Sequence, residues 1–128
     1  MEKTIFVVDD SSTNLLIARN MLMDEYKVIT LSSAEKMFAF LEKIRPDLIL
    51  LDIEMPDMDG FEALEILKAD ASKSDIPVIF LTIMNDPQTA VRSLQMGAVG
   101  FLTKPLTKFA LLDRIKCHLS INDYTQTQ

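Results

Sequence analysis

The sequence has 128 residues, of which 48% are hydrophobic and 25% charged, which suits one soluble globular domain with a substantial core. Its net charge of −6 argues against a general nucleic-acid binder or a ligand of anionic membranes. The chain has a single cysteine, Cys117, which excludes an internal disulfide. It has no apolar run long enough to span a membrane and no room for a signal peptide before the first predicted strand, so we expect a cytoplasmic protein.

Five apolar runs along the chain each end at a polar residue. These runs predict strands at residues 4–8, 27–30, 48–51, 78–81 and 100–103. The runs that begin at Thr4, Leu48 and Val78 are continuously apolar, which is typical of central strands buried on both faces. The run at Lys27 is short and has polar flanks, so it suits an edge strand.

Helices are predicted between the strands from capping residues and apolar spacing. Ser32 and Glu35 form a capping-box pattern before the second helix. Asp86 is the expected N-cap of the fourth helix, with Pro87 in its first position. The apolar positions that mark the five helices are Leu15, Leu16, Ile17, Met21 and Leu22; Ala34, Met37, Phe38, Leu41 and Ile44; Phe61, Leu64 and Leu67; Val91, Leu94 and Met96; and Phe109, Leu112, Ile115 and Leu119.

This alternation predicts an α/β domain with a doubly wound, five-stranded parallel sheet of the flavodoxin-like kind, covered by helices on both faces. With the apolar strands in the middle and the short ones at the edges, the strand order is 2-1-3-4-5. The direction of winding then changes between the strands that end at Asp9 and Asp52. Ligands of such sheets bind beyond the carboxyl ends of the strands, at this switch point.

Chemically useful side chains fall at the carboxyl ends of four predicted strands. They are Asp9, Asp10, Asp52, Thr82 and Lys104. Each alone is most simply a turn former, a helix cap or a solvated charge, but the predicted sheet brings all five to one edge. Three carboxylates in one crevice repel each other unless a cation lies among them, and a site with oxygen ligands only favours Mg²⁺.

A hydroxyl donor and a fixed ammonium group opposite such an ion form a cradle for a phosphoryl group. One of the carboxylates would then act as a nucleophile and form an aspartyl-phosphate. The residues therefore predict a phosphoryl-transfer site at this edge of the sheet.

Four segments resemble the receiver domain of two-component response regulators. They are residues 7–11 (VVDDS), 50–60 (LLDIEMPDMDG), 80–82 (FLT) and 101–105 (FLTKP). Their order and spacing are highly specific, and the resemblance extends from Lys3 to about Leu119. Because this family itself supplies a known example of the 2-1-3-4-5 sheet, the predicted topology rests partly on the resemblance.

The resemblance implies a role for each residue of the cluster. Asp52 is the expected phosphoacceptor, which takes a phosphoryl group from a histidine of a kinase or of a histidine phosphotransfer protein. Asp10 and Asp52, with the backbone carbonyl of Glu54, are expected to bind Mg²⁺ directly, and Asp9 mostly through water. Lys104 is expected to pair with a phosphoryl oxygen.

The resemblance also implies a switch. Thr82 would donate its hydroxyl to the phosphoryl group and move towards it, which would free space for Phe101 to turn inward. The surface formed by the fourth helix, the last strand and the fifth helix would carry this change to a downstream protein or to a C-terminal output domain. The chain would thus be a signalling switch that catalyses only its own phosphorylation and dephosphorylation, with no direct binding of nucleic acid or membrane.

The resemblance bears on two features of the backbone. The receiver domain is expected over residues 1–121, and the polar residues 122–128 are expected to be a tail or the start of a linker. The resemblance also implies that the peptide bond between Lys104 and Pro105 is cis, although cis bonds are uncommon before proline, since this turn aims the lysine back over the strand ends.

Two residues near the expected site bear on reaction rates. Ile83 departs from the small residue that is usual directly after the threonine of this family. Its branched side chain would narrow the approach to Asp52, or else point into neighbouring apolar surface, where its size would not affect access. Glu54 places a further carboxylate beside the site entrance. His118 is expected to be a surface or packing residue and not a phosphorylated histidine.

Two other protein classes share parts of this pattern. A hydrolase of the haloacid-dehalogenase type also uses an aspartate nucleophile and magnesium, but it needs a second aspartate two positions later, where this chain has Ser11 or Ser12. A flavodoxin-like cofactor binder needs donors after the first strand, where Asp9 and Asp10 would repel a phosphate. Turnover of a general phosphatase substrate would support the first class, and a yellow preparation the second.

Overall fold

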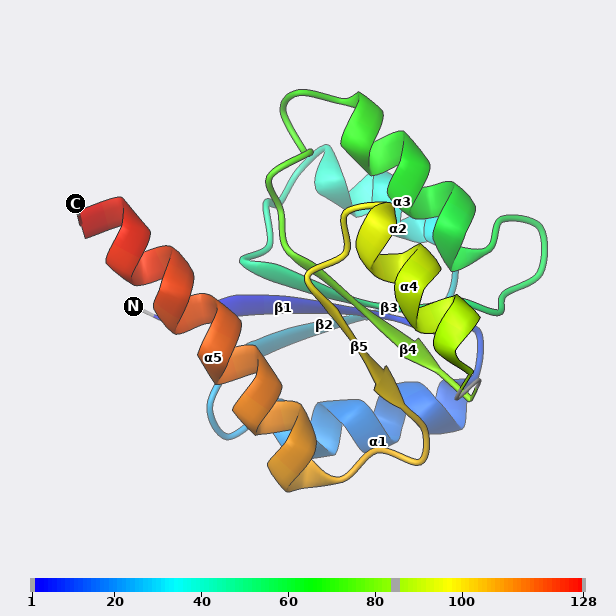
Figure 1. Cartoon of the computed structure of the whole chain (residues 1–128). Coiled ribbons are helices and arrows are strands. Elements are labelled where there is room, and N and C mark those ends of the chain that lie inside the picture. Colours follow the sequence, from blue (N-terminus) through cyan, green and yellow to red (C-terminus); the bar gives the residue numbers. More distant parts are fainter. Residues whose placement is uncertain (1, 84–85, 128) are drawn as a thin grey trace.

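The computed structural model of the chain describes residues 2–83 and 86–127, within which strands and helices alternate (Figure 1). The strands are β1 (Thr4–Val8), β2 (Lys27–Leu31), β3 (Leu48–Asp52), β4 (Val78–Thr82) and β5 (Gly100–Thr103). The helices are α1 (Ser12–Leu22), α2 (Ala34–Leu41), α3 (Gly60–Ala69), α4 (Pro87–Gln95) and α5 (Lys108–Thr127). All neighbouring strands pair in parallel in the order β2-β1-β3-β4-β5, which confirms the predicted sheet.

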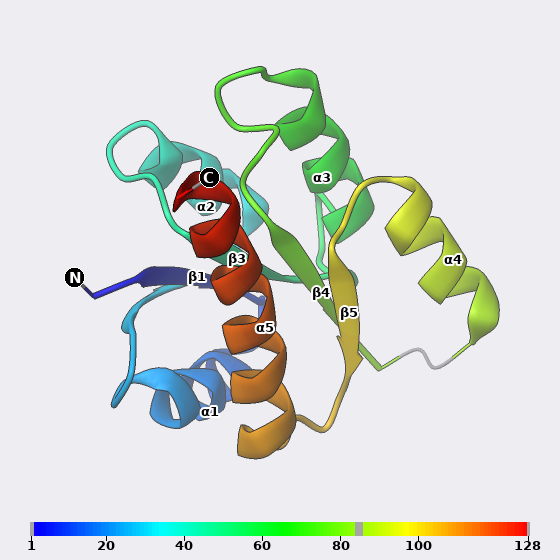
Figure 2. The ribbon, with the colours of Figure 1, turned by 60° about the vertical axis from the view of Figure 1, so that its left-hand side comes forward.

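The sheet separates two layers of core side chains, because alternate residues of a strand point to opposite faces. On one face Phe6, Ile49 and Phe80 pack with side chains of α2 and α3. On the other face Leu50 and Ile79 pack with side chains of α1 and α5. Figures 1 and 2 show α1 and α5 together on one side of the sheet, with α2, α3 and α4 on the other. Strands β3 and β4 are buried along their whole length, as their continuous apolar runs predict.

In two helices the buried face agrees only in part with the predicted apolar positions, since Leu15, Leu22, Ile115 and Leu119 are buried as predicted and others are not. In α1 the buried residues are Leu15, Ala18 and Leu22, which share one side of a 3.6-residue helix, while Leu16 and Ile17 are exposed. In α5 the buried residues are Leu111, Ile115 and Leu119, at spacings of four. Phe109, predicted to belong to this stripe, is 81% exposed because it lies half a turn away from Leu111.

Helix α4 shows the largest difference from its prediction. Val91 and Leu94 were expected on its apolar face towards the core, yet they are 52% and 54% exposed. The residues it buries are Thr89 and Ser93. Small side chains face the core because α4 lies close against the sheet edge at β5, so its larger apolar side chains point outward.

The helix caps confirm one prediction and correct another. Asp86 caps α4, and its carboxylate accepts from the backbone N–H of Thr89 at 2.7 Å, as predicted. The predicted capping box of Ser32 with Glu35 is wrong by one residue, because Ser33 is the N-cap of α2 and accepts from Lys36 N at 3.1 Å. The hydroxyl of Ser32 instead accepts from the ammonium of Lys36.

The last helix runs on beyond the predicted end of the domain. Helix α5 extends to Thr127, so residues 122–127, predicted to be a tail or linker start, continue this helix, and Gln128 lies outside the described residues. The domain boundary at residue 121 stays a prediction. Among the described residues, none of the helices has the length and apolar character needed to cross a membrane.

Candidate functional site

The carboxyl ends of β1, β3 and β4 bring the predicted site residues together. Asp9 directly follows β1 and is 1% exposed, Asp52 ends β3 and is 4% exposed, and Thr82 ends β4 fully buried. Asp10 is exposed beside them. Carboxylate oxygens of Asp9, Asp10 and Asp52 all lie within 4.8 Å of one another, so the expected acidic cluster is present.

Lys104 reaches this cluster from the end of β5. Its ammonium donates to Asp9 Oδ2 at 2.9 Å and lies 3.2 Å from Asp52 Oδ1. Its backbone N–H donates to the carbonyl of Thr82 at 2.7 Å, which ties the turn after β5 to the end of β4. The Lys104–Pro105 peptide bond is cis, as predicted.

The polar run after β1 both holds Asp9 and begins α1. The second carboxylate oxygen of Asp9, Oδ1, accepts from the backbone N–H of Ser11 at 2.9 Å. Ser11 is itself the N-cap of α1 and accepts from Asn14 N at 3.2 Å. Since one oxygen bonds Ser11 and the other Lys104, the orientation of the Asp9 carboxylate is fixed.

The electrostatics of the site favour a bound cation. Burial, followed by the negative charge of Asp9, raises the pKa of Asp52 to about 6, and Lys104 offsets only part of this. Burial lowers the pKa of Lys104, but its hydrogen bond to Asp9 and the charges of Asp52 and Asp9 outweigh burial and raise it. Three carboxylates face one ammonium, so the cluster carries excess negative charge that a divalent ion would neutralise.

The predicted switch residues lie on the neighbouring strands β4 and β5. Thr82 pairs with Thr103, and Phe101 pairs with Phe80, two positions earlier. Phe101 is partly buried and packs against the core cluster on the side of α2 and α3. Ile83, one residue beyond Thr82, is 68% exposed and so is not packed into neighbouring apolar surface.

Gly60 lies beside the end of β3, a placement for which the sequence analysis predicted no role. Gly60 opens α3, and its N–H donates to the carbonyl of Ile53 at 2.7 Å. Asp59 caps the helix in a capping box with Glu62, a spacing that the sequence displays. The start of α3 is thus fastened directly to the backbone that follows Asp52.

Comparison with known proteins decides between the three classes that share this pattern. Residues 5–116 match the family model described as the response regulator receiver domain. The chain belongs to this receiver domain family. Phosphoryl transfer to an aspartate is the general function of these domains within two-component signalling.

Curated relatives of this receiver domain are longer proteins. The chain is 33% identical, over 98% of its length, to a probable cyclic di-GMP phosphodiesterase of Vibrio cholerae, of which it covers 31%. It is 35% identical, over 91% of its length, to the response regulator PleD of Caulobacter vibrioides, of which it covers 26%. The receiver domain therefore spans about a third or less of these two relatives.

A solved structure supports the fold. The signal receiver domain of a signal transduction histidine kinase from Syntrophus aciditrophicus is 38% identical, with a TM-score of 0.84. The match covers 92% of this chain and 90% of that one. Sequence and structure thus lead to the same family over nearly the whole chain.

Proposed function

We propose that Asp52 accepts a phosphoryl group from a phosphohistidine of a sensor kinase or histidine phosphotransfer protein. The observation that carries this proposal is the position of the Asp52 carboxylate. It lies at the carboxyl end of β3, within 4.8 Å of two other carboxylates and 3.2 Å from an ammonium group. Incubation with acetyl phosphate should add one phosphoryl group to the chain, and peptide mapping should place it on Asp52.

The residues present supply the groups that this transfer needs. An oxygen of the Asp52 carboxylate attacks phosphorus, the bond from phosphorus to the histidine nitrogen breaks, and the imidazole keeps its electron pair. Lys104 is placed to pair with a phosphoryl oxygen, since its ammonium already lies 3.2 Å from Asp52. Thr82, buried at the end of β4, would donate its hydroxyl to another phosphoryl oxygen.

The acidic cluster fits a magnesium ion. Asp10 and Asp52, with the backbone carbonyl of Glu54, would bind the ion directly, and Asp9 through water, because Mg²⁺ prefers oxygen ligands and keeps several waters. When bound, the ion supplies positive charge that offsets the repulsion between the attacking carboxylate and the phosphoryl oxygens.

Magnesium binding should be visible as added stability. At a hundredfold excess over its dissociation constant, a ligand that binds only the native state adds about 2.7 kcal/mol to the free energy of unfolding. Millimolar Mg²⁺ is therefore expected to raise the melting temperature, and Asp10→Asn to remove most of the rise. Asp24→Asn, an exposed change in the turn after α1, should leave it intact. A melting curve that Mg²⁺ does not move would contradict the proposed site.

The raised pKa of Asp52 predicts a stability difference that depends on pH. Between about pH 4 and pH 6 the folded chain holds a proton on Asp52 that the unfolded chain releases, so stability falls as pH rises through this window. Asp52→Asn lacks this titration. With a chelator present, it should unfold in urea with a free energy about 2–3 kcal/mol higher than wild type above pH 6, and equal to it below pH 4. A constant difference at all pH values would show that burial does not perturb Asp52.

Ile83 is expected to slow the chemistry at Asp52. Its branched side chain is exposed and belongs to the residue that follows Thr82, so it would narrow the approach of water and of small phosphodonors if it points towards Asp52. Ile83→Ala should speed both loss of the phosphoryl group and labelling by acetyl phosphate, by up to roughly a hundredfold. Equal rates in the two proteins would show that Ile83 does not gate the site.

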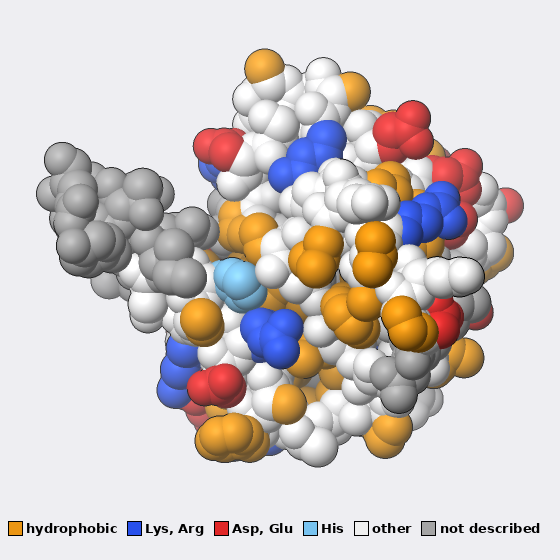
Figure 3. All heavy atoms as spheres, in the orientation of Figure 1, with side chains coloured by type: hydrophobic (Ala, Val, Ile, Leu, Met, Phe, Trp, Pro, Cys, Tyr) orange, Lys and Arg blue, Asp and Glu red, His pale blue; other side chains and the backbone are white. Residues whose placement is uncertain are grey.

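The output of this switch is proposed to pass through the face formed by α4, β5 and α5. Figure 3 shows hydrophobic side chains gathered on this face, and those of Val91, Leu94 and Val99 are exposed. Phosphorylation would act on this face through Thr82 and Phe101, which lie in the neighbouring strands β4 and β5. A downstream protein or a C-terminal output domain is the proposed recipient.

A further inference from the structure

Helix α4 gains little stability from the side chains that it buries. Its buried residues are Thr89 and Ser93, whose side chains are small and polar and so bury little apolar surface. In contrast, α3 buries Phe61, Leu64 and Leu67 in the core. Since most helical stability in proteins comes from burying an apolar face, α4 is the less firmly held of the two.

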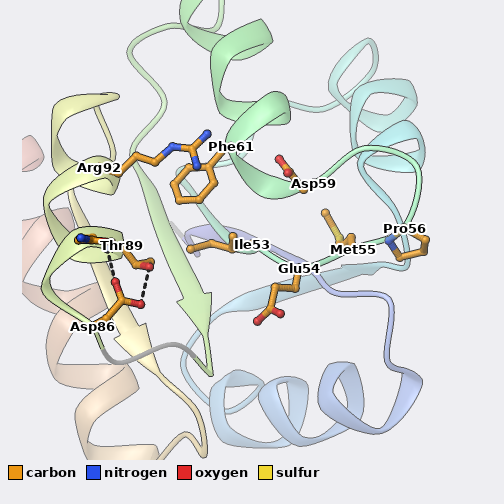
Figure 4. Close-up of a pocket in the computed structure, with 10 residues that line it drawn as sticks. Ile53, Glu54, Met55, Pro56, Asp59, Phe61, Asp86, Thr89 and Arg92 are labelled. Atoms are coloured by element: carbon orange, nitrogen blue, oxygen red, sulfur yellow. Dashed lines mark hydrogen bonds between the residues drawn. The ribbon is translucent and has the colours of Figure 1, made fainter.

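A cleft also separates α4 from the segment that follows Asp52. Its volume is about 750 Å³, and Figure 4 shows residues of both sides around it. Ile53, Glu54 and Phe61 line it from the side of β3 and α3, while Thr89 and Arg92 line it from α4. Along this side, α4 therefore faces open space in place of packed side chains.

Arg92 crosses towards α3 and contacts Phe61. Its guanidinium carbon lies 3.9 Å from the centre of the Phe61 ring, in cation–π geometry. Phe61 is itself firmly seated, because it is 8% exposed and its ring packs edge-on against Phe80 at 5.2 Å. The contact therefore joins a weakly held helix to a well-packed part of the core.

We propose that Arg92 and Phe61 form a latch that holds α4 next to α3 across this cleft, and that α4 moves away as a unit when the latch breaks. Opening would uncover Phe61 and Ile53, the residue directly after the phosphoacceptor, while β3 and β4 remain folded. The latch depends only on packing and charge, so it stands whether or not Asp52 accepts a phosphoryl group.

Hydrogen exchange of the α4 amides tests the latch. A partly exposed cation–π contact corresponds to about a two- to fivefold change in an equilibrium constant. Arg92→Ala should therefore speed exchange of the α4 amides about two- to fivefold and leave those of α3 unchanged. Alanine favours helix more than arginine does, so faster exchange would not result from intrinsic propensity. Gln95→Ala, an exposed change on the same helix, is the matched control and should not speed exchange.

A double-mutant cycle with Phe61→Leu separates the latch from other effects of removing a charge near the end of α4. If the contact is the cause, Arg92→Ala should have no further effect on α4 exchange in the Phe61→Leu background. If Arg92→Ala speeds α4 exchange equally in both backgrounds, the faster exchange comes from the lost charge near the end of the helix dipole, and the proposal is overturned. Unchanged α4 exchange in Arg92→Ala, or equal acceleration throughout the domain, would overturn it too.

Discussion

Asp52→Asn is expected to reduce phosphorylation of the chain by acetyl phosphate or by a phosphohistidine donor to background. Asp52 is a buried carboxylate at the end of β3, 3.2 Å from Lys104, whereas both oxygens of the neighbouring Asp9 already accept hydrogen bonds. An amide oxygen in place of the Asp52 carboxylate is a far weaker nucleophile. Removing a nucleophile that acts together with its neighbours lowers rates by more than about a hundredfold. Radiolabel or intact mass, measured with excess Mg²⁺, reads out the loss.

A matched control lies in the same loop. Asp57 is exposed and has a φ of 69°, a left-handed conformation that asparagine adopts as readily as aspartate. Asp57→Asn therefore makes the same chemical change without backbone strain, and its labelling should equal that of wild type. Undiminished labelling in Asp52→Asn would show that another residue is the phosphoacceptor. Loss in both variants would place the effect in the loop and not in the Asp52 carboxylate.

The sheet and the acidic cluster were predictable because a strand buried on both faces leaves a plain signal. The runs of β3 and β4 are continuously apolar and stop at Asp52 and Thr82. Once these strands are parallel neighbours, their polar ends must meet at one edge. Local sequence patterns do not show where the Lys104 side chain points, and its pairing with the site was predicted from the resemblance to the receiver family.

The helix faces were harder to predict because an apolar residue can lie on either side of a helix. Leu16, Leu94 and Phe109 all fit an apolar stripe by type, and only packing against the sheet shows that each points outward. The contact of Arg92 with Phe61 joins residues 31 positions apart on two different helices. No periodicity in the sequence relates such positions.

Gly60→Ala is expected to lower both stability and phosphorylation. A Cβ at Gly60 would lie 2.5 Å from the backbone oxygen of Asp52 and 2.8 Å from Cα of Ile53, so the start of α3 must move away from β3. Such overpacking against the backbone should cost about 2–3 kcal/mol in the free energy of unfolding, seen as a melting temperature roughly 8–12 °C lower. Because Asp52 shifts with its backbone, labelling should slow about tenfold.

Gly100→Ala provides the comparison that isolates close backbone approach from loss of glycine itself. A Cβ at Gly100 would meet the end of the Arg114 side chain at 3.1 Å, and a guanidinium group on a flexible stem moves aside at little cost. In a strand, alanine also loses less conformational entropy than glycine on folding, so this variant should be within about 0.5 kcal/mol of wild type. At Gly60, which lies in a helix, alanine is intrinsically more favourable than glycine, as it is at Gly100. A loss of stability in Gly60→Ala can therefore be assigned to the clash with the backbone of Asp52 and Ile53. If Gly60→Ala has the same melting temperature as Gly100→Ala, the backbone at Gly60 moves at little cost, and Gly60 does not fix the position of Asp52.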